Sequence, residues 1–268
     1  MKAAWRWLVL VAVAGVLLQL FFVARIAAML VIDPQSTAFE RSEAWRVTTE
    51  KGELRWRQQW TPYDKISNNL KRAVIASEDD GFASHDGVDW DALEKAWQKN
   101  TKAEERAAKA TEQAAQAQAR MATKNPGKTT ATKPAPAPQA KAVKTPKVVG
   151  GSTITQQLAK NLFLSGERTL LRKGQEFVLT LLLEAVLDKQ RILEIYLNSV
   201  EWGEGVFGAE AAAQHYYRKP AAQLSAYEAA RLAVMLPRPK YFEKLPNSSY
   251  VAGRAGVIAN RLESAELP

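Results

Sequence analysis

A run of 18 uncharged residues, Trp7 to Ala24, constrains the chain more than any other stretch, and apolar residues continue past the single Arg25 to Ile32. About 20 apolar residues in a helix span the hydrocarbon core of a bilayer. Lys2 and Arg6 precede the run, so the positive-inside rule places the N-terminus in the cytoplasm and the remainder outside. A cleaved signal peptide is the alternative. Its apolar core is usually about 7 to 15 residues, so we predict a retained anchor, with Arg25 snorkelling toward the outer headgroups.

The composition changes abruptly at Lys99. From there to Lys147 the chain is mainly Ala, Lys, Gln, Thr and Pro, and Met121 and Val143 are its only large aliphatic residues. Its first half suits a transient helix, and its proline-rich second half is predicted to be disordered. The segment holds eleven Lys or Arg against three Glu, a net +8, which leaves about +1 of the chain's +9 for the rest. This charge on a tether argues against a folded nucleic-acid-binding face, and for contact with anionic lipid or polymer, or mere solvation.

These shifts predict four parts. Residues 1–32 form a cytoplasmic tip and transmembrane anchor, residues 33–98 the first part of a folded domain, residues 99–147 a basic low-complexity insertion, and residues 148–268 the second part of the same domain. The absence of cysteine and the presence of only two histidines, His85 and His215, argue against a protein-built zinc site. A carboxylate-held magnesium site remains open.

The first candidate for chemistry is the acidic stretch from Ser77 to Gly87. Apolar residues at helical spacing precede it, and Thr61-Pro62 is a suitable start for that helix, which should stop near Gly81. Glu78 then lies at the helix C-terminus, where the dipole disfavours negative charge. Partial burial would raise its pKa further, toward the value that a proton-transfer group needs. A solvated acidic helix end is the alternative.

A second candidate begins at Gly150-Gly151. Ser152 or Thr153 can cap a helix, and Thr153-x-x-Gln156 is a capping box. Ile154, Leu158 and Leu162 then form an apolar stripe, whereas Thr153, Gln157 and Lys160 share a polar one. A polar stripe entered through two glycines suits a phosphate or sugar ligand, although an ordinary amphipathic helix gives the same pattern.

A third candidate is a carboxylate beside cations. Arg172 and Glu176 lie one helical turn apart, next to Lys173 and to a run, Phe177 to Leu187, that is too apolar for a surface helix. An ordinary ion pair is one interpretation. The other is that two carboxylates and several cations act together at an anionic, phosphate-bearing centre.

The remaining patterns favour a domain that is all-α or nearly so. Val47 to Trp60 is predicted to be a short hairpin or extended arm, and residues 201–208 a glycine-punctuated loop. Asp89 should cap a helix with Trp90, Leu93 and Trp97 on one face. Further helices are predicted for Lys189 to Val200, Ala209 to Tyr217, the Ser225-x-x-Glu228 capping box to Pro237, and Tyr250 to Leu262.

Four motifs occur in order along the chain: Glu78-Asp79-x-x-Phe82-x-x-His85-x-Gly87, Gly150-Gly151-Ser152-Thr153-Ile154-Thr155-Gln156-Gln157 with Lys160-Asn161, Arg172-Lys173-x-x-Glu176, and Ile192-Leu193-Glu194-x-Tyr196-Leu197-Asn198 with Gly203-x-Gly205-x-x-Gly208. Together they resemble the peptidoglycan glycosyltransferase family, in particular its monofunctional biosynthetic transglycosylases. The likeness runs from about Trp60 onward. The insertion interrupts it, where the family normally has a short loop.

The resemblance implies a lysozyme-like fold with a large lobe and a smaller membrane-facing one, which polymerises lipid II into β-1,4-linked strands and releases undecaprenyl pyrophosphate. Glu78 would be the general base and Glu176 the second catalytic carboxylate, with Lys160, Arg172 and Lys173 stabilising the departing charge. The other motif side chains carried over as substrate-binding are Asp79, Phe82, His85, Ser152, Thr153, Gln157, Asn161 and Asn198.

The same resemblance implies a catalytic domain in the periplasm, held at the bacterial inner membrane by one span. It implies no obligate cofactor, and it leaves room for a divalent cation, Mg²⁺ or Mn²⁺, and for other cell-wall synthases as partners. No Ser-x-x-Lys or Lys-Thr-Gly motif follows, so a fused transpeptidase is not expected. Two alternatives stay open: a lytic transglycosylase or muramidase on the same fold, and a non-catalytic wall-binding protein.

Overall fold

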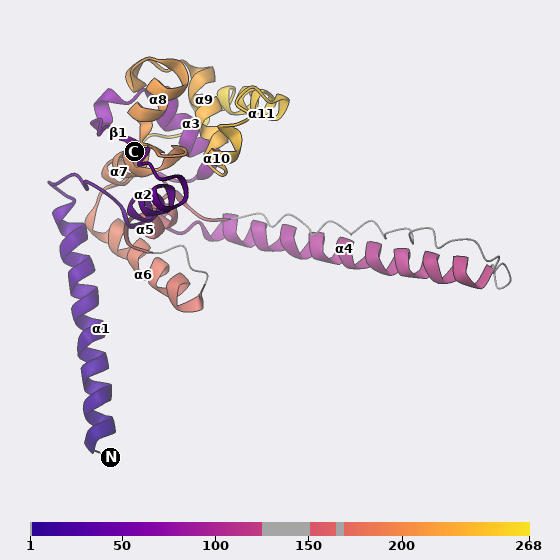
Figure 1. Cartoon of the computed structure of the whole chain (residues 1–268), viewed down its shortest axis with the longest axis horizontal. Helices are drawn as coiled ribbons and strands as arrows, with labels where there is room; N and C mark the ends of the chain where they lie inside the picture. The colour runs from indigo at the N-terminus through magenta and orange to yellow at the C-terminus, as the bar shows by residue number, and fades with distance from the viewer. Residues whose placement is uncertain (1, 125–150, 165–168) are drawn as a thin grey trace. The chain divides into compact units, whose positions relative to one another are not determined.

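The structure is a computed structural model that describes residues 2–124, 151–164 and 169–268. The chain divides into two units, one formed by Met1–Asp89 with Ser152–Pro268 and the other by Trp90–Gly151. In its described residues the first unit is helical apart from short strands (Figure 1). The predicted fold class is therefore confirmed, whereas the division into two lobes stays a prediction.

The predicted anchor is α1 (Lys2–Ala28), the helix in the described ranges that is long and apolar enough to cross a membrane. Most of its side chains are exposed, as those of a lipid-facing helix are. Its C-terminal end is fastened to the rest of the unit. There the ring of Phe22 meets that of Phe163 edge-on, with 5.4 Å between the centroids, and Arg191 donates to the carbonyl oxygen of Met29 at 2.8 Å.

The hairpin predicted for Val47 to Trp60 is wrong, because Val47 lies inside α2 (Ala38–Lys51). A capping box starts this helix: the Glu40 amide donates to Thr37 Oγ1 at 3.0 Å, and the Thr37 amide donates to Glu40 Oε2 at 2.6 Å. Gly52, in the left-handed conformation, ends it. The extended-arm part of the prediction holds only for the residues that follow.

A small sheet joins that arm to the predicted loop at residues 201–208. β1 (Arg57–Gln58) pairs in parallel with β3 (Val206–Phe207), and β3 pairs antiparallel with β2 (Glu201–Gly203), so this loop is a hairpin. Gly205 allows the hairpin to approach the backbone of Arg55 closely. Its φ is +71°, and a Cβ there would lie 2.1 Å from the Arg55 carbonyl oxygen.

The helix that carries Glu78 is α3 (Asn68–Glu78), and it starts later than predicted. Tyr63–Lys65 form a 3₁₀ turn, so Ser67, rather than Thr61, is the N-cap, and its hydroxyl accepts from the Leu70 amide at 3.1 Å. The backbone at Thr61 bonds instead to the Asn198 side chain. The C-terminal end is close to the prediction, with Glu78 as the last helical residue.

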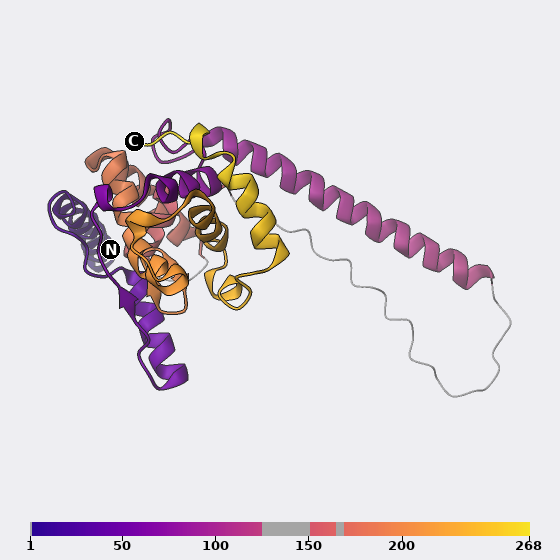
Figure 2. The ribbon, with the colours of Figure 1, turned by 90° about the horizontal axis from the view of Figure 1, so that it is seen from above.

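The core of the first unit forms where α3 packs with the helices of the second half of the chain. The predicted caps Thr153 and Ser225 both form complete capping boxes, and Ile154, Leu158 and Leu162 are fully buried. Figure 2 shows the C-terminal α11 beside α9. The elements are α5 (Ile154–Phe163), α6 (Leu170–Val186), α7 (Lys189–Ser199), α8 (Ala209–Tyr217), α9 (Ala226–Met235), α10 (Pro239–Phe242) and α11 (Ser249–Ala259), with 3₁₀ turns at Ala221–Gln223 and Leu262–Ser264.

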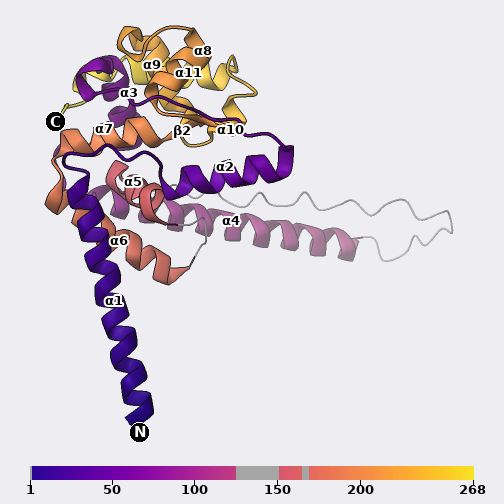
Figure 3. The same ribbon diagram turned by 60° about the vertical axis from the view of Figure 1, so that its left-hand side comes forward.

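The prediction that α6 is too apolar for the surface is wrong for one of its sides. Leu179 and Leu183 are buried, but Val178 and Leu181 are 41% and 44% exposed. The reason is the neighbouring helix: α6 lies beside α1 (Figure 3), and Gln175 exchanges amide hydrogen bonds with α1. α1 is long and apolar enough to cross a membrane, and beside such a helix lipid can replace protein as the cover of apolar residues.

The second unit consists, in its described residues, of α4 (Trp90–Lys124) and Gly151. α4 starts directly after Asp89, the predicted cap, and crosses the boundary predicted at residue 98 without a break. Trp90 and Trp97 are exposed, and the side chains described between residues 99 and 113 are exposed or half-buried, which fits a segment without a core. The disorder predicted for the second half of the insertion falls largely on residues 125–147, outside the described residues.

Candidate active site

Glu78 ends α3 with a half-buried carboxylate. Burial raises its pKa above the ordinary value, and the neighbouring charge of Asp79 acts in the same direction. Hydrogen bonds from Gln157 and Ser77 oppose the rise. The predicted direction is confirmed, with burial as its main cause.

A two-step hydrogen-bond chain orients this carboxylate. Gln157 Nε2 on α5 donates to Glu78 Oε2 at 3.0 Å, and Gln157 Oε1 accepts from the Tyr196 hydroxyl of α7 at 3.0 Å. Tyr196 is fully buried, and its burial raises the pKa of the phenol well above the ordinary value, so the hydroxyl stays a donor. This fixes which end of the Gln157 amide faces Glu78.

Tyr196 belongs to the fourth motif and to a predicted helix, but the sequence did not indicate its part in the site. Nothing in the periodicity indicated where its hydroxyl would end.

Asp79 and His85 hold the loop after α3 against the start of α5. Asp79 Oδ2 accepts from the Ile154 amide at 2.9 Å, and Asp79 Oδ1 lies 2.8 Å from His85 Nε2. The Gly87 amide donates to His85 Nδ1 at 3.1 Å, so Nε2 carries the imidazole proton and donates to Asp79. In this arrangement both side chains bond to protein, and their predicted contact with substrate stays a prediction.

The same loop is closed by Thr153 and packed by Phe82. Thr153 Oγ1 donates to the Gly87 carbonyl oxygen at 2.6 Å while it caps α5, and Phe82 is fully buried. Gly87 has a φ of +85°, and a Cβ there would lie 2.8 Å from side-chain atoms of Thr180 and Glu184. Three of the predicted site residues, Asp79, Phe82 and Thr153, therefore shape the loop from inside.

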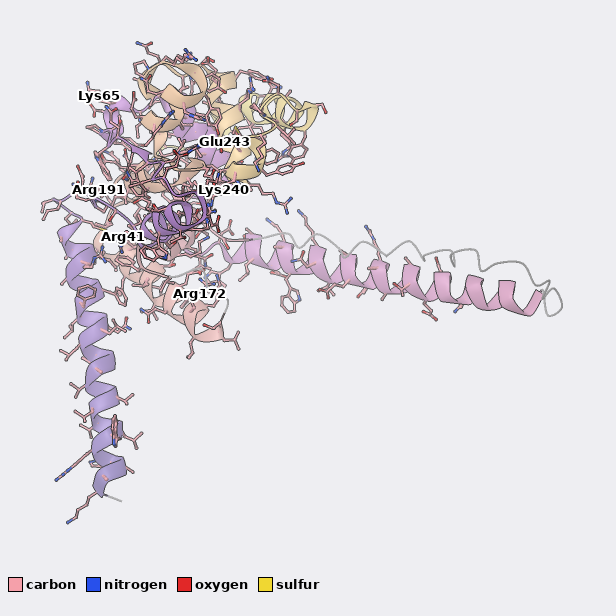
Figure 4. All side chains as sticks on the ribbon, in the orientation of Figure 1. Arg41, Lys65, Arg172, Arg191, Lys240 and Glu243 are labelled. Carbon is pink, nitrogen blue, oxygen red and sulfur yellow. The ribbon has the colours of Figure 1, made fainter. Side chains whose placement is uncertain are left out.

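The second centre surrounds Glu176 on α6. Arg172 Nη1 donates to Glu176 Oε2 at 2.8 Å, and Lys173 Nζ donates to Glu176 Oε1, so both oxygens of this buried carboxylate are paired. The predicted Arg172–Glu176 pair is confirmed. Arg172 Nε is buried and has no hydrogen-bond partner within the described part of the chain. Figure 4 labels Arg172 on α6.

Lys160 connects this cluster to α5. Its side chain reaches solvent, and the surrounding protein lowers its pKa by desolvation, with Arg172 and Lys173 acting in the same direction and Glu176 against them. An arriving anion would offset the repulsion among the three cations. The cluster therefore suits a negatively charged ligand.

α5 places both centres on one helix face. Gln157, which contacts Glu78, and Lys160, which faces Glu176, are three residues apart, a spacing that brings their Cβ atoms within about 5–6 Å. A reactant between them would meet a carboxylate with a raised pKa at one end and a cation cluster at the other. This juxtaposition is the polar stripe predicted from the sequence.

The other predicted residues lie at different depths. Ser152 is exposed at the start of α5, and Asn161 is buried on it. Asn198 is fully buried, where its side chain bonds to the backbone of Thr61 and Glu194. Asn198 therefore ties α7 to the segment before α3, and Gly150 of the motif lies outside the described residues.

A protein-built metal centre does not fit these side chains. Among the residues that the structure describes, no three His, Cys, Asp or Glu gather as ligands. Arg172 and Lys173 occupy both oxygens of Glu176, and His85 and the Ile154 amide occupy those of Asp79.

The two centres suit an enzyme that deprotonates one reactant and neutralises the anionic leaving group of another. Sequence comparison assigns the family. A family profile described as Transglycosylase matches residues 46–135 and 135–263, two segments that meet inside the insertion. The chain belongs to this transglycosylase family, whose fold is the lysozyme-like one predicted from the sequence.

Similar curated proteins come from Burkholderia and are named "Biosynthetic peptidoglycan transglycosylase". The protein of Burkholderia thailandensis is 52% identical over 250 residues, which cover 93% of this chain and 82% of that relative. The protein of Burkholderia lata is 48% identical over 267 residues, with 98% and 92% covered, and that of Burkholderia pseudomallei is 49% identical over 267 residues, with 98% and 88% covered.

Proposed function

We propose that this chain is a peptidoglycan glycosyltransferase that polymerises lipid II into β-1,4-linked glycan strands and releases undecaprenyl pyrophosphate. The observation that carries the proposal is the pair of centres on one face of α5, where Gln157 holds Glu78 and Lys160 stands beside the Arg172–Lys173–Glu176 cluster. The names of the relatives supply the substrate class.

In the proposed reaction Glu78 takes the proton of the acceptor's GlcNAc 4-hydroxyl. The hydroxyl oxygen forms a bond to the donor's anomeric carbon as the bond from that carbon to the pyrophosphate oxygen breaks, and the electron pair leaves with the pyrophosphate. Attack opposite an α-linked leaving group gives a β linkage, and no activated water takes part. The raised pKa of Glu78 suits it to accept a proton near neutral pH.

Lys160, Arg172 and Lys173 neutralise the departing pyrophosphate. A fixed cation beside developing charge lowers the barrier without reorganisation. Glu176 lies about one helical turn after Arg172 and Lys173 and positions both of these side chains by pairing with them. Its two paired oxygens favour that electrostatic role over nucleophilic attack.

Cleavage of existing glycan is the second candidate, because a single helix-end glutamate also serves lytic enzymes. A cation cluster beside the second carboxylate has no task in hydrolysis of a neutral glycosidic bond. It has one when the leaving group is a pyrophosphate. The non-catalytic wall-binding alternative leaves the raised pKa of Glu78 without a purpose.

We further propose the setting of the enzyme. The charges of Lys2 and Arg6, which precede the uncharged run of α1, favour a cytoplasmic N-terminus and a periplasmic catalytic domain on the bacterial inner membrane. Its proposed partners there are lipid II and the nascent strand, which it binds as substrates, and other cell-wall synthases, which it binds as proteins. A divalent cation, Mg²⁺ or Mn²⁺, stays part of the proposal only as an ion that the substrate's pyrophosphate would hold, because the carboxylate oxygens of Glu176 and Asp79 already accept hydrogen bonds from protein.

The deciding experiment is incubation of the purified full chain with lipid II, with the products separated by size before and after muramidase digestion. We expect glycan polymer that muramidase shortens, together with undecaprenyl pyrophosphate. Release of small fragments from preformed glycan, without polymer from lipid II, would support the lytic alternative. Binding of both without turnover would support the wall-binding one.

A further inference from the structure

A hollow of about 320 Å³ lies where α1 ends and the folded unit begins. Arg25 of α1 and Arg41 of α2 line it from two sides, and the connection between the two helices, including Asp33 and Ser36, completes it. Figure 4 labels Arg41 near this end of α1. The hollow is separate from the Glu78 and Glu176 centres.

The two arginines in this hollow lack a carboxylate partner among residues 2–124, 151–164 and 169–268. Arg41 uses Nη1 to donate to the Ser36 backbone and hydroxyl oxygens, both at 3.0 Å, and the rest of its guanidinium is open. Arg25 lies against the rings of Phe163 and Phe21, at 5.3 and 5.9 Å from their centroids, contacts that leave its N–H groups available.

The one acid that lines the hollow is already neutralised. Asp33 Oδ1 accepts from Arg191 Nη2 at 2.7 Å, and Arg191 also donates to the Met29 and Ile32 carbonyl oxygens, which fixes the loop. Arg25 and Arg41 therefore face a shared space with like charges and no local counter-charge. An anion with several acceptor oxygens would remove that repulsion and pair with two guanidiniums, the geometry that favours phosphate.

The position along α1 identifies the source of that phosphate. The 18 uncharged residues before Arg25 rise about 27 Å at about 1.5 Å each, close to the ~30 Å hydrocarbon thickness of a bilayer. Arg25 thus emerges at the level of the lipid headgroups. Leu30, Val31 and Ile32 are 55%, 85% and 59% exposed beside the hollow, as expected for side chains at a membrane interface.

We propose that this hollow binds the phosphate headgroup of a membrane phospholipid, held between Arg25 and Arg41. Its volume is at the lower end of the roughly 300–1,000 Å³ of ligand pockets, which suits a headgroup better than a sugar carrying a peptide. The bound lipid fixes the angle between α1 and α2 and so the height of the catalytic domain above the bilayer. The proposal is independent of the glycosyl-transfer chemistry.

The test is native mass spectrometry of the full chain released from detergent, titrated with phosphatidylglycerol and with diacylglycerol, which has the same chains but no phosphate. We expect retention of phosphatidylglycerol alone. The double variant Arg25→Gln/Arg41→Gln should bind it at least about tenfold more weakly, because two charge-assisted contacts are lost. Arg238→Gln/Arg254→Gln removes the same charge from two exposed sites elsewhere and should bind as the unaltered chain does.

Arg41→Gln alone serves as a second variant if the double variant does not enter the membrane, since Arg41 is exposed and outside α1; it should weaken binding severalfold. The site is overturned if Arg25→Gln/Arg41→Gln and Arg41→Gln both bind phosphatidylglycerol as the unaltered chain does. It is also overturned if Arg238→Gln/Arg254→Gln loses as much affinity as Arg25→Gln/Arg41→Gln. Displacement of phosphatidylglycerol by an equal or lower concentration of undecaprenyl pyrophosphate would assign the hollow to the prenyl lipid and overturn the phospholipid assignment.

Discussion

Removing one oxygen atom, in Tyr196→Phe, tests how Glu78 is oriented. The Tyr196 hydroxyl donates to Gln157 Oε1, and Gln157 Nε2 donates to Glu78. Without the hydroxyl the amide loses its fixed partner, and the flipped amide would point an oxygen at the carboxylate. An unsatisfied acceptor of this kind costs about 1–3 kcal/mol.

If about 1 to 2 kcal/mol of this orientation is lost at the transition state, kcat falls about 5- to 30-fold, since about 1.4 kcal/mol is a factor of ten. KM should change little, because Tyr196 is fully buried and the change removes no contact with substrate. The acid limb of the pH–rate profile should also move. The base works only when ionised, and the Gln157 bond lowers the pKa of Glu78, so weakening it moves the loss of activity to higher pH.

The assay is initial-rate polymerisation of lipid II across a pH series. Tyr216→Phe is the matched control, since it removes a half-buried hydroxyl that donates to the Trp202 carbonyl oxygen at 2.8 Å, outside the site. It should lower stability by a similar amount and leave the pH profile unchanged. A Tyr196→Phe enzyme with the original kcat and the original acid limb would refute the orienting role.

Three further outcomes are expected. Glu176→Gln should cut kcat at least about 100-fold with a smaller change in stability, because Arg172 and Lys173 lose the charge that positions them; normal turnover would reduce the group to an ordinary ion pair. Asp79→Asn should lower the free energy of unfolding by about 1–3 kcal/mol, because its NH₂ group would face a donor at His85 or Ile154. The measurement is the thermal midpoint, which should fall, and an unchanged midpoint would contradict this. Deleting Ala103 to Pro146 should leave polymerisation in detergent within severalfold of the original, because loop closure changes by only about 0.6 kcal/mol per doubling of length; loss of activity under all conditions would place the segment in the site.

Local signals predicted well what local interactions determine. The capping boxes at Thr153 and Ser225, the apolar stripe of α5 and the end of α3 at Glu78 all depend on residues within about one helical turn. The box at Thr37 and Glu40 is equally local. The alternating residues after Gly52 indicate strand, and the hairpin prediction extended that pattern back over Val47 to Lys51, which belong to α2.

Contacts between distant segments were beyond the sequence. Gln157, which donates to Glu78, lies 79 positions further along the chain, and Tyr196, which donates to Gln157, lies another 39 positions on. The short strand β1 exists only because it meets β3, and nothing in two residues, Arg57 and Gln58, signals this pairing. The exposed face of α6 also depends on its neighbour, since apolarity alone does not distinguish burial in protein from contact with lipid.

The most direct test of the proposed mechanism is Glu78→Gln, which keeps the shape of the side chain and removes the proton acceptor. Glu53→Gln, an exposed site whose carboxylate pairs with Arg55, is the control. Binding of lipid II and formation of polymer should be measured on the same preparations. We predict that Glu78→Gln binds lipid II as the unaltered chain does, keeps its thermal midpoint and makes no detectable polymer. Polymer formed by Glu78→Gln at the rate of the Glu53→Gln control would contradict the assignment of Glu78 as the base.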